Sequence, residues 1–341
     1  MTLVVLLLTA GGGMVRMGAG ARSLATEPVT PAAAGAQTQC HGLDRGDVRG
    51  EDPDYTSKRL TEFPNHKRLC HGIWLPNPRR YLVPQGLAIT GRTAWISGFR
   101  FRPGYGQRPC QLMKVDIVTG KRLAFHGAIF GRVGDRPRTY CRHGGGVIAS
   151  GRHLWLVEKN KLWLVDPSRG GNVLEAKRVW RIKSPVRGSA IVANRERIGL
   201  VPHVANGDAR IYWFVSRRLL QPGVFDLGLT HVGTHQLGPI RSTRIPRFVQ
   251  GATLDSSGRL YLSRSNLSCA ELVTPHGRRV AFVPGAEGIQ FASGGRRLWA
   301  VSESGARPYA TSRKPFTPAV SSFEWPRLFR GKRAHCRFPA Y

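Results

Sequence analysis

The 341-residue chain has few acidic residues and very few lysines. It contains 20 aspartates and glutamates against 52 lysines and arginines, of which only ten are lysine, and its formal net charge is +32. A GC-rich coding sequence produces such an arginine bias on a solvated surface. A positive field of this size also attracts polyanions such as nucleic acids, anionic lipid surfaces and cell-wall phosphate polymers. Zinc-finger spacing, an aromatic RNA-binding signature and a basic helix with heptads are all absent, so we expect no sequence-specific binding of nucleic acid.

Long apolar runs are also missing. The apolar segment 2–10 is too short to cross a bilayer. Small residues follow it, and residues 1–25 are predicted to be a secretory signal peptide, although a basic n-region is absent. The segment after it is rich in Ala, Pro and Thr, as in an export linker. We therefore expect a secreted, extracellular protein with no transmembrane segment in its mature chain.

Cysteine is sparse and never closely spaced. The absence of a Cys-x-x-Cys pair disfavours metal sites and redox motifs. Six widely spaced cysteines in an exported chain predict disulfides, with fifteen connectivities open and free buried thiols as the alternative. We favour Cys110–Cys141, because both lie between the first two copies of the repeat described below, and we expect Cys336 to tie the C-terminal tail to the body. The other candidates are Cys40, Cys70 and Cys269.

No long stretch shows a helical period of 3.6 residues, so few helices are expected. Instead, one phrase recurs: a polar or small residue, a glycine, a short apolar run, a turn and an aromatic or apolar strand. Its five glycines are Gly86, Gly146, Gly188, Gly251 and Gly288. A unit repeated at roughly 40–50 residues is typical of a four-stranded propeller blade. The predicted fold class is all-β, a β-propeller of five blades, with a sixth, degenerate blade as the alternative.

The repeats divide the chain into segments. Residues 26–80 are polar and broken by prolines and are predicted to form an export linker and an irregular lead-in. The propeller repeats occupy 81–305. The tail 306–341 is expected to close the propeller or to pack on its outside. Tryptophans in the strand patterns are interpreted as packing between blades, against an alternative role as sugar-stacking platforms; they are Trp95, Trp155, Trp163 and Trp299.

Two further motifs indicate a family. The strand Gly258-Arg259-Leu260-Tyr261 and the turn from Asp116 to Lys121, together with the Gln-Gly and Glu-Gly starts, resemble exported bacterial β-propellers, broadly NHL-like, SMP-30/gluconolactonase-like and strictosidine-synthase-like proteins. The resemblance covers roughly 81–305 and is specific for the fold. It implies a divalent metal held by a Glu before Gly, which Glu287 matches, together with two asparagines and an aspartate; the corresponding strand starts of this chain carry Gln, Gly, Arg and Gln instead. Since hard cations want several oxygen ligands, we expect no metal cofactor, and Glu287 is only a weak candidate ligand.

The residues before the repeated glycines are predicted to ring the mouth of the central channel, because radial repetition brings equivalent positions together. The candidate ligand-binding residues are Gln85, His143, Arg187, Gln250 and Glu287. A second layer just beyond the aromatic strands consists of Glu158, His203, Arg264 and Glu303. Capping of strand ends is the structural alternative for the ring. A Gly-x-Ser-x-Gly elbow and a His-Glu-x-x-His motif are both absent, so the sequence names no catalytic residue.

These observations predict a secreted binding or scaffold protein rather than an enzyme. Its ligand would be anionic or polyhydroxylated, as a carbohydrate is, and would contact Arg187 and the glutamines at the channel mouth. A hydrolase of the lactonase or esterase kind using the same channel is one alternative. Non-specific adhesion of the arginine-rich surface to cell-wall polyanions is the other.

Overall fold

The computed structural model describes residues 40–76, 82–101, 109–310 and 313–338. The predicted signal peptide and the start of the predicted linker lie outside these residues. The described chain is a five-bladed β-propeller with two short α-helices, α1 (Ser216–Leu219) and α2 (Trp325–Phe329), and the 3-10 turns η1 (Arg45–Asp47) and η2 (His66–Arg68). None of the described helices is long and apolar enough to cross a membrane.

Each blade is an antiparallel sheet whose first strand lies nearest the channel. The first blade consists of β2 (Leu82–Thr90), β3 (Thr93–Arg100), β4 (Cys110–Asp116) and β5 (Arg122–His126). The second begins with β8 (Gly146–Ser150), β9 (His153–Glu158), β10 (Lys161–Val165) and β12 (Arg178–Ile182). The third consists of β13 (Ala190–Ala193), β14 (Arg197–Val201), β15 (Ala209–Val215) and β18 (Arg241–Ile245). The fourth consists of β19 (Val249–Leu254), β20 (Leu260–Ser265), β21 (Ala270–Val273) and β22 (Arg279–Phe282).

The fifth blade closes the ring with strands from both ends of the chain. It consists of β23 (Ala286–Phe291), β24 (Arg297–Ser302), β25 (Val320–Glu324) and β1 (Leu69–Ile73). The outermost strand β1 pairs antiparallel with β25, with Ile73 opposite Val320. The segment predicted as an irregular lead-in therefore contributes a blade strand, and the C-terminal tail contributes its neighbour. Shared closure of this kind joins the two ends of the propeller through backbone hydrogen bonds.

The long gap between Asp208 and Val249 does not form a sixth blade in the described residues. It supplies β15 and β18 of the third blade. Between them, β16 (Asp226–Leu227) and β17 (Gln236–Leu237) add in parallel to the outer edge of the second blade. A separate small sheet contains β6 (Ala128–Gly131), β7 (Thr139–Tyr140) and β11 (Val173–Glu175).

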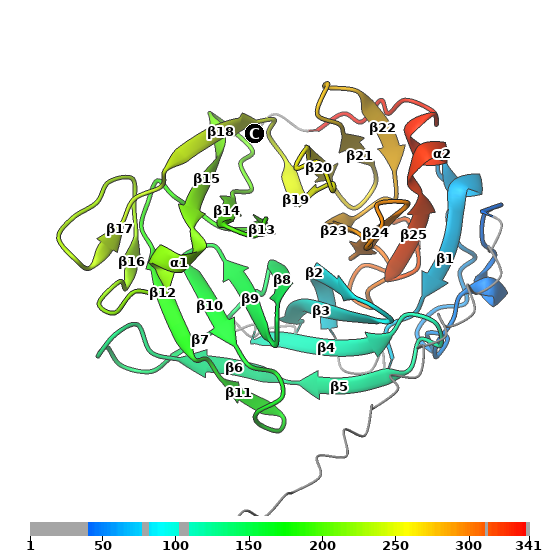
Figure 1. Cartoon of the computed structure of the whole chain (residues 1–341). Helices are drawn as coiled ribbons and strands as arrows, with labels where there is room; N and C mark the ends of the chain where they lie inside the picture. The colour runs from blue at the N-terminus through cyan, green and yellow to red at the C-terminus, as the bar shows by residue number, and fades with distance from the viewer. Residues whose placement is uncertain (1–39, 77–81, 102–108, 311–312, 339–341) are drawn as a thin grey trace, which may run out of the picture. The chain divides into compact units, whose positions relative to one another are not determined.

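The five inner strands surround the centre in the order β2, β8, β13, β19 and β23 (Figure 1), and each contacts the next, with β23 returning to β2. Glycine permits this close approach. A Cβ added to Gly146 would lie 2.8 Å from the backbone nitrogen of Ile191, and one added to Gly288 would lie 2.6 Å from that of Leu87. At these two positions glycine is thus a packing requirement of neighbouring inner strands.

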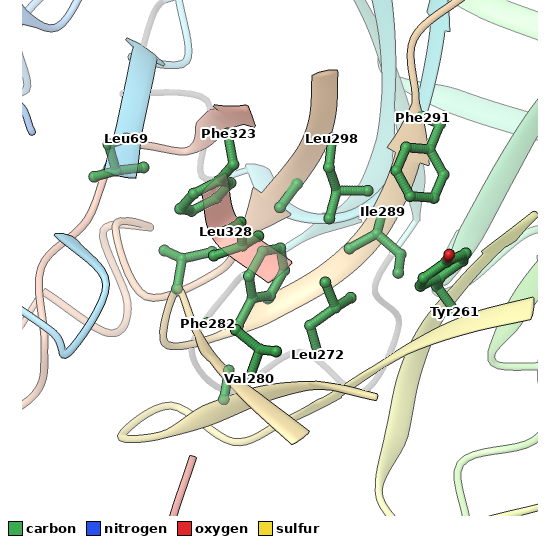
Figure 2. Close-up of a cluster of buried hydrophobic side chains, with 14 of the residues drawn as sticks. Leu69, Tyr261, Leu272, Val280, Phe282, Ile289, Phe291, Leu298, Phe323 and Leu328 are labelled. Carbon is green, nitrogen blue, oxygen red and sulfur yellow. The ribbon is translucent and has the colours of Figure 1, made fainter. Parts of the chain in front are cut away.

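Apolar side chains fill the spaces between blades. Figure 2 shows the cluster that joins the fourth and fifth blades, where Tyr261, Leu272 and Phe282 meet Ile289, Leu298 and Phe323. Leu69 of β1 and Leu328 of α2 complete it. The four predicted core tryptophans are all buried, from 0% exposure at Trp163 to 8% at Trp95. Their interpretation as interblade packing is confirmed.

All six cysteines form disulfides. Cys110–Cys141 is present as predicted, and Cys336 bonds to Cys269, which ties the tail to the fourth blade. The third bridge, Cys40–Cys70, attaches the start of the described chain to β1. Free thiols are therefore excluded for this chain.

Candidate functional site

A cavity of about 270 Å³ lies at the end of the channel where the inner strands begin. Four of the five predicted ring residues line it, and two of the predicted second layer join them. The lining residues are Gln85, Phe99, His143, Ser189, His203, Gln250, Glu287, Glu303 and Tyr309. Side chains from all parts of the ring thus converge on one polar space.

One member of the predicted ring does not line this cavity. Arg187 is exposed and lies outside the lining, and Ser189 takes the equivalent position. The Ser189 backbone nitrogen donates to the Val201 carbonyl over 2.7 Å, as the Gly145 nitrogen donates to the Val157 carbonyl over 2.8 Å. In the third blade, Ala190 takes the position that glycine occupies in the first two blades. The prediction from the sequence used Gly188 instead, and it therefore placed the ring residue two positions too early.

A line of hydrogen bonds runs across the cavity wall. The Gln85 Nε2 donates to Glu303 Oε2 over 2.8 Å, so its Oε1 must accept. His143 Nε2 lies 3.1 Å from that Oε1 and is therefore the protonated ring nitrogen. The imidazole of His143 also stacks on Phe99, with ring centroids 4.6 Å apart. Stacking and hydrogen bonding together fix the tautomer and the orientation of this histidine.

The wall ends in a buried carboxyl pair. Glu287 and Glu303 hydrogen-bond to each other, and Glu287 is buried while Glu303 is half-buried. Burial raises the pKa of Glu303 to about 7, against the opposing effect of the Gln85 and Glu287 hydrogen bonds. Burial, followed by the charge of Glu303, raises the pKa of Glu287 well above its usual range. The two groups titrate as one unit that still holds at least one proton at neutral pH.

The opposite wall is built around His203. Burial lowers the pKa of His203, partly opposed by hydrogen bonds with the Val249 backbone and the Gln250 side chain, so the imidazole is neutral at pH 7. Its ring meets the Phe248 ring edge-on at 5.9 Å. Phe248 has a φ of 62°, which non-glycine residues rarely adopt. Phe338 of the tail stacks on Phe248 at 5.1 Å and supports this conformation.

The second predicted layer divides between the cavity and the structural frame. Glu303 and His203 line the cavity, whereas Glu158 and Arg264 do not. Glu158 accepts a hydrogen bond from the Arg142 backbone over 2.9 Å and pairs with Lys161. Arg264 is buried and donates to Glu271 over 2.8 Å. Both Glu158 and Arg264 are therefore buried charges with hydrogen-bonded partners, which is a structural role.

The cavity also contains residues that the sequence pattern did not indicate. Phe99 lies at the far end of β3, and Tyr309 lies in the tail beyond the last repeat glycine. Neither belongs to the repeated phrase, so alignment of its copies had no signal for them. Ser189 could have been found, because it precedes a small residue at the start of an inner strand.

The donor set at this mouth does not fit the metal that the family resemblance implies. Among the described lining residues only Glu287 and Glu303 carry carboxyl groups, and burial raises the pKa of both, which disfavours the two ionised carboxylates that a divalent cation needs. Within the described residues, one group of three potential ligands does meet, formed by Cys110, Cys141 and Glu158. Its two sulfur atoms are bonded to each other in a disulfide and offer no thiolate.

Comparison with known proteins adds a fold-level likeness. No protein-family model and no curated protein sequence matches the chain. Among solved structures it is similar to Myxococcus xanthus glutaminyl cyclase (TM-score 0.42, 11% identity, covering 72% of this chain and 90% of that one). It is also similar to the calcium-binding protein regucalcin from Agrobacterium tumefaciens (0.42, 12%, 74% and 92%) and to the PQQ-bound aldose sugar dehydrogenase of Streptomyces coelicolor (0.44, 13%, 75% and 97%). These likenesses are confined to the propeller fold and assign no activity.

Proposed function

We propose that this protein binds a small, uncharged, hydroxyl-rich ligand in the cavity at the channel mouth. The observation that supports this most is the composition of the wall: two amides, a serine hydroxyl, two imidazoles and a proton-sharing carboxyl pair face one space. Such groups donate and accept in alternation, as the hydroxyls of a polyol or sugar require. Gln85, Gln250 and Glu287 lie on the inner strands β2, β19 and β23, so little ordering of these three residues is needed on binding.

The charge of the lining favours one of the two ligand classes predicted from the sequence. No lysine or arginine is among the described residues that line the cavity, because Arg187 lies elsewhere. The carboxyl pair gains negative charge as the pH rises past about 7 and then repels anions. We therefore retain the polyhydroxylated ligand and abandon the anionic one. Three disulfides in a chain of this size are typical of an oxidising compartment, which supports a location outside the cytoplasm.

The proposal is tested by comparing neutral sugars with the acids formed by oxidation of their C1, which share the remaining hydroxyls and carry a carboxylate. Isothermal titration at pH 8 would compare glucose and xylose with gluconate and xylonate. We expect the neutral sugars to bind and the aldonates to bind at least tenfold more weakly. Gln250→Ala should weaken sugar binding, whereas Gln221→Ala, on the exposed surface, should leave it unchanged. Equal or tighter binding of the aldonates, or no effect of Gln250→Ala, would show that this assignment is wrong.

Acid–base hydrolysis of a lactone or ester is a second candidate function, favoured by the pKa of Glu303. A group that titrates near 7 beside one that stays protonated is suited to general base and general acid catalysis at neutral pH. Glu303 would take a proton from water as the water oxygen bonds to the carbonyl carbon. Glu287 would protonate the alkoxide oxygen as the C–O bond of the ring breaks.

The two candidates separate experimentally. Hydrolysis of gluconolactone, followed by acid release at constant pH and corrected for the spontaneous reaction, should be lost in Glu303→Gln and Glu287→Gln if the pair is catalytic. Sugar binding by those variants should persist, because a glutamine amide still hydrogen-bonds hydroxyls. Hydrolysis no faster with the unaltered protein than with either variant would exclude the catalytic role and leave the binding role standing.

A further inference from the structure

The larger internal space of the propeller is a different one from the candidate site. A cavity of about 560 Å³ occupies the channel beyond the repeat glycines and is lined by residues of all five inner strands. These strands surround the centre in Figure 1. Many of the lining side chains are apolar, among them Leu87, Val147, Ile191, Leu254, Ile289 and Phe291. The two ends of one channel therefore differ in chemistry, with carboxyls and amides at one mouth and a mixed lining rich in apolar side chains toward the other.

Two exposed arginines are among the residues that line this cavity. Arg195 lies in the turn between β13 and β14, and Arg217 lies in α1, which follows β15, so both come from the third blade. Neither guanidinium forms an ion pair with a carboxylate of the described chain, and no aspartate or glutamate is among the described lining residues. Leu220, next to this helix, also lines the cavity and remains 49% exposed.

The turn that carries Arg195 is held in place. The Asn194 side-chain oxygen accepts hydrogen bonds from the backbone nitrogens of Glu196 and Arg197 over 3.0 and 2.8 Å. These bonds fix the backbone from which the Arg195 side chain extends. A guanidinium group binds a carboxylate or phosphate through two parallel hydrogen bonds. The anionic head of an amphiphile could form such bonds with these arginines.

We propose that this channel binds a single-chain anionic amphiphile of the fatty-acid type. Its hydrocarbon chain enters the apolar channel, and its anionic head remains at the rim on Arg195 and Arg217. Each methylene group that moves from water into contact with apolar side chains of the channel stabilises the complex. The two arginines, which form no ion pair within the described chain, supply the positive charge that attracts the carboxylate. This site is separate from the proposed sugar site and does not depend on it.

Titration with dodecanoate, dodecanol and acetate tests the proposal. The buffer contains no detergent, and each amphiphile is kept below the concentration at which it forms micelles. We expect one molecule of dodecanoate to bind per chain, at least tenfold more tightly than either dodecanol or acetate. The double variant Arg195→Ala/Arg217→Ala should weaken dodecanoate binding about tenfold. The matched control Arg197→Ala/Arg218→Ala removes the same charge from neighbouring positions that do not line the cavity. Equal weakening by the control would show a general attraction to a basic surface and would overturn the proposal.

Blocking the channel supplies an independent measurement. Ala149 and Ser150 are exposed at the end of β8 and line the cavity, so a bulky side chain there narrows the entrance without disturbing the core. Folded Ala149→Trp should lose dodecanoate binding, and Ser150→Phe provides the same test if the first variant fails to fold. Glu287→Gln, at the opposite mouth, should bind dodecanoate normally. Full affinity in a folded blocked variant would overturn the proposal.

Discussion

Gln85 donates a hydrogen bond from its Nε2 to Glu303 Oε2 over 2.8 Å, although 218 positions separate the two residues along the chain. The bond joins the inner strand of the first blade to the loop after β24 of the fifth. It also links His143 to the carboxyl pair, because the same amide accepts from that imidazole. The protonation of the pair therefore depends on contacts that form only when the ring is closed.

Replacement of Gln85 should change the titration of the pair. The amide hydrogen bond favours the ionised form of Glu303, so Gln85→Leu should raise the pKa of Glu303 above about 7. Carbon-13 NMR of the side-chain carboxyls as a function of pH measures this shift. Gln221→Leu, a surface substitution of the same type, serves as the control. An unchanged or lower pKa in folded Gln85→Leu would contradict the hydrogen-bond assignment.

The carboxyl pair should make the protein less stable as the pH rises. Glu303 has a higher pKa in the folded chain, about 7, than in the unfolded chain, 4.5, so the folded state binds more protons between these values. Its contribution is complete below pH 4.5 and is lost as the pH rises through 7. Urea unfolding at several pH values should show a flatter pH dependence for Glu303→Gln than for the parent over this interval. A profile identical to the parent's would mean that Glu303 titrates normally.

Gly288 should not tolerate a side chain, because backbone of the first blade lies within contact distance of its added Cβ. Gly288→Ala should lower the free energy of unfolding by about 1–3 kcal/mol, since its methyl group would meet the backbone of the first blade 2.6 Å away at the Leu87 nitrogen. Gly171→Ala is the matched control, because nothing lies within 4 Å of its added Cβ. Chemical denaturation compares the two. Similar small effects at both positions would argue against close packing of the inner strands.

The bridge from the tail to the fourth blade should contribute strongly to stability. Cys269 and Cys336 close a loop with a sequence separation of 67, and a chain-entropy model predicts a loss of about 4 kcal/mol for Cys269→Ser/Cys336→Ser. The tail would also lose its anchor beside Phe338, which stacks on Phe248 under His203. Proteolysis of the variant should cut first near the C-terminus, whereas early cleavage within the blades would contradict a local role for the bridge.

The overall architecture could be predicted because it depends on local, repeated signals. The same local signals recur along the chain. They are a glycine at the start of the repeated phrase and, after a turn, an aromatic or apolar strand, and each recurrence indicates another blade. The pairing of Cys110 with Cys141 was also within reach, since their segments are near neighbours in the repeat. In the fifth blade the signal weakens, because β1 and β25 come from opposite ends of the chain and neither carries the repeated phrase.

The candidate site could be predicted only in part. Gln85, Gln250, Glu287 and His143 converge as the ring predicts, because each is adjacent to an inner-strand start that the glycine marks. Arg187 was predicted to lie in the ring because it precedes Gly188, but in the third blade Ala190 takes the place of the repeated glycine. Only the hydrogen-bond register shows that Ser189, two residues later, is equivalent to Gly145. Glu303 was assigned to a second layer, although it bonds directly to Glu287.

The sequence by itself therefore determined the propeller, its blade number within one alternative, and the polar character of one channel mouth. Periodicity carries that information because each blade must bury the same faces and pack the same backbone against its neighbour. Only the tertiary structure decided which side chains share a proton and which cations face the channel. Hydrogen bonds and burial depend on distances of a few tenths of an ångström between residues far apart in the chain, and no local pattern records them.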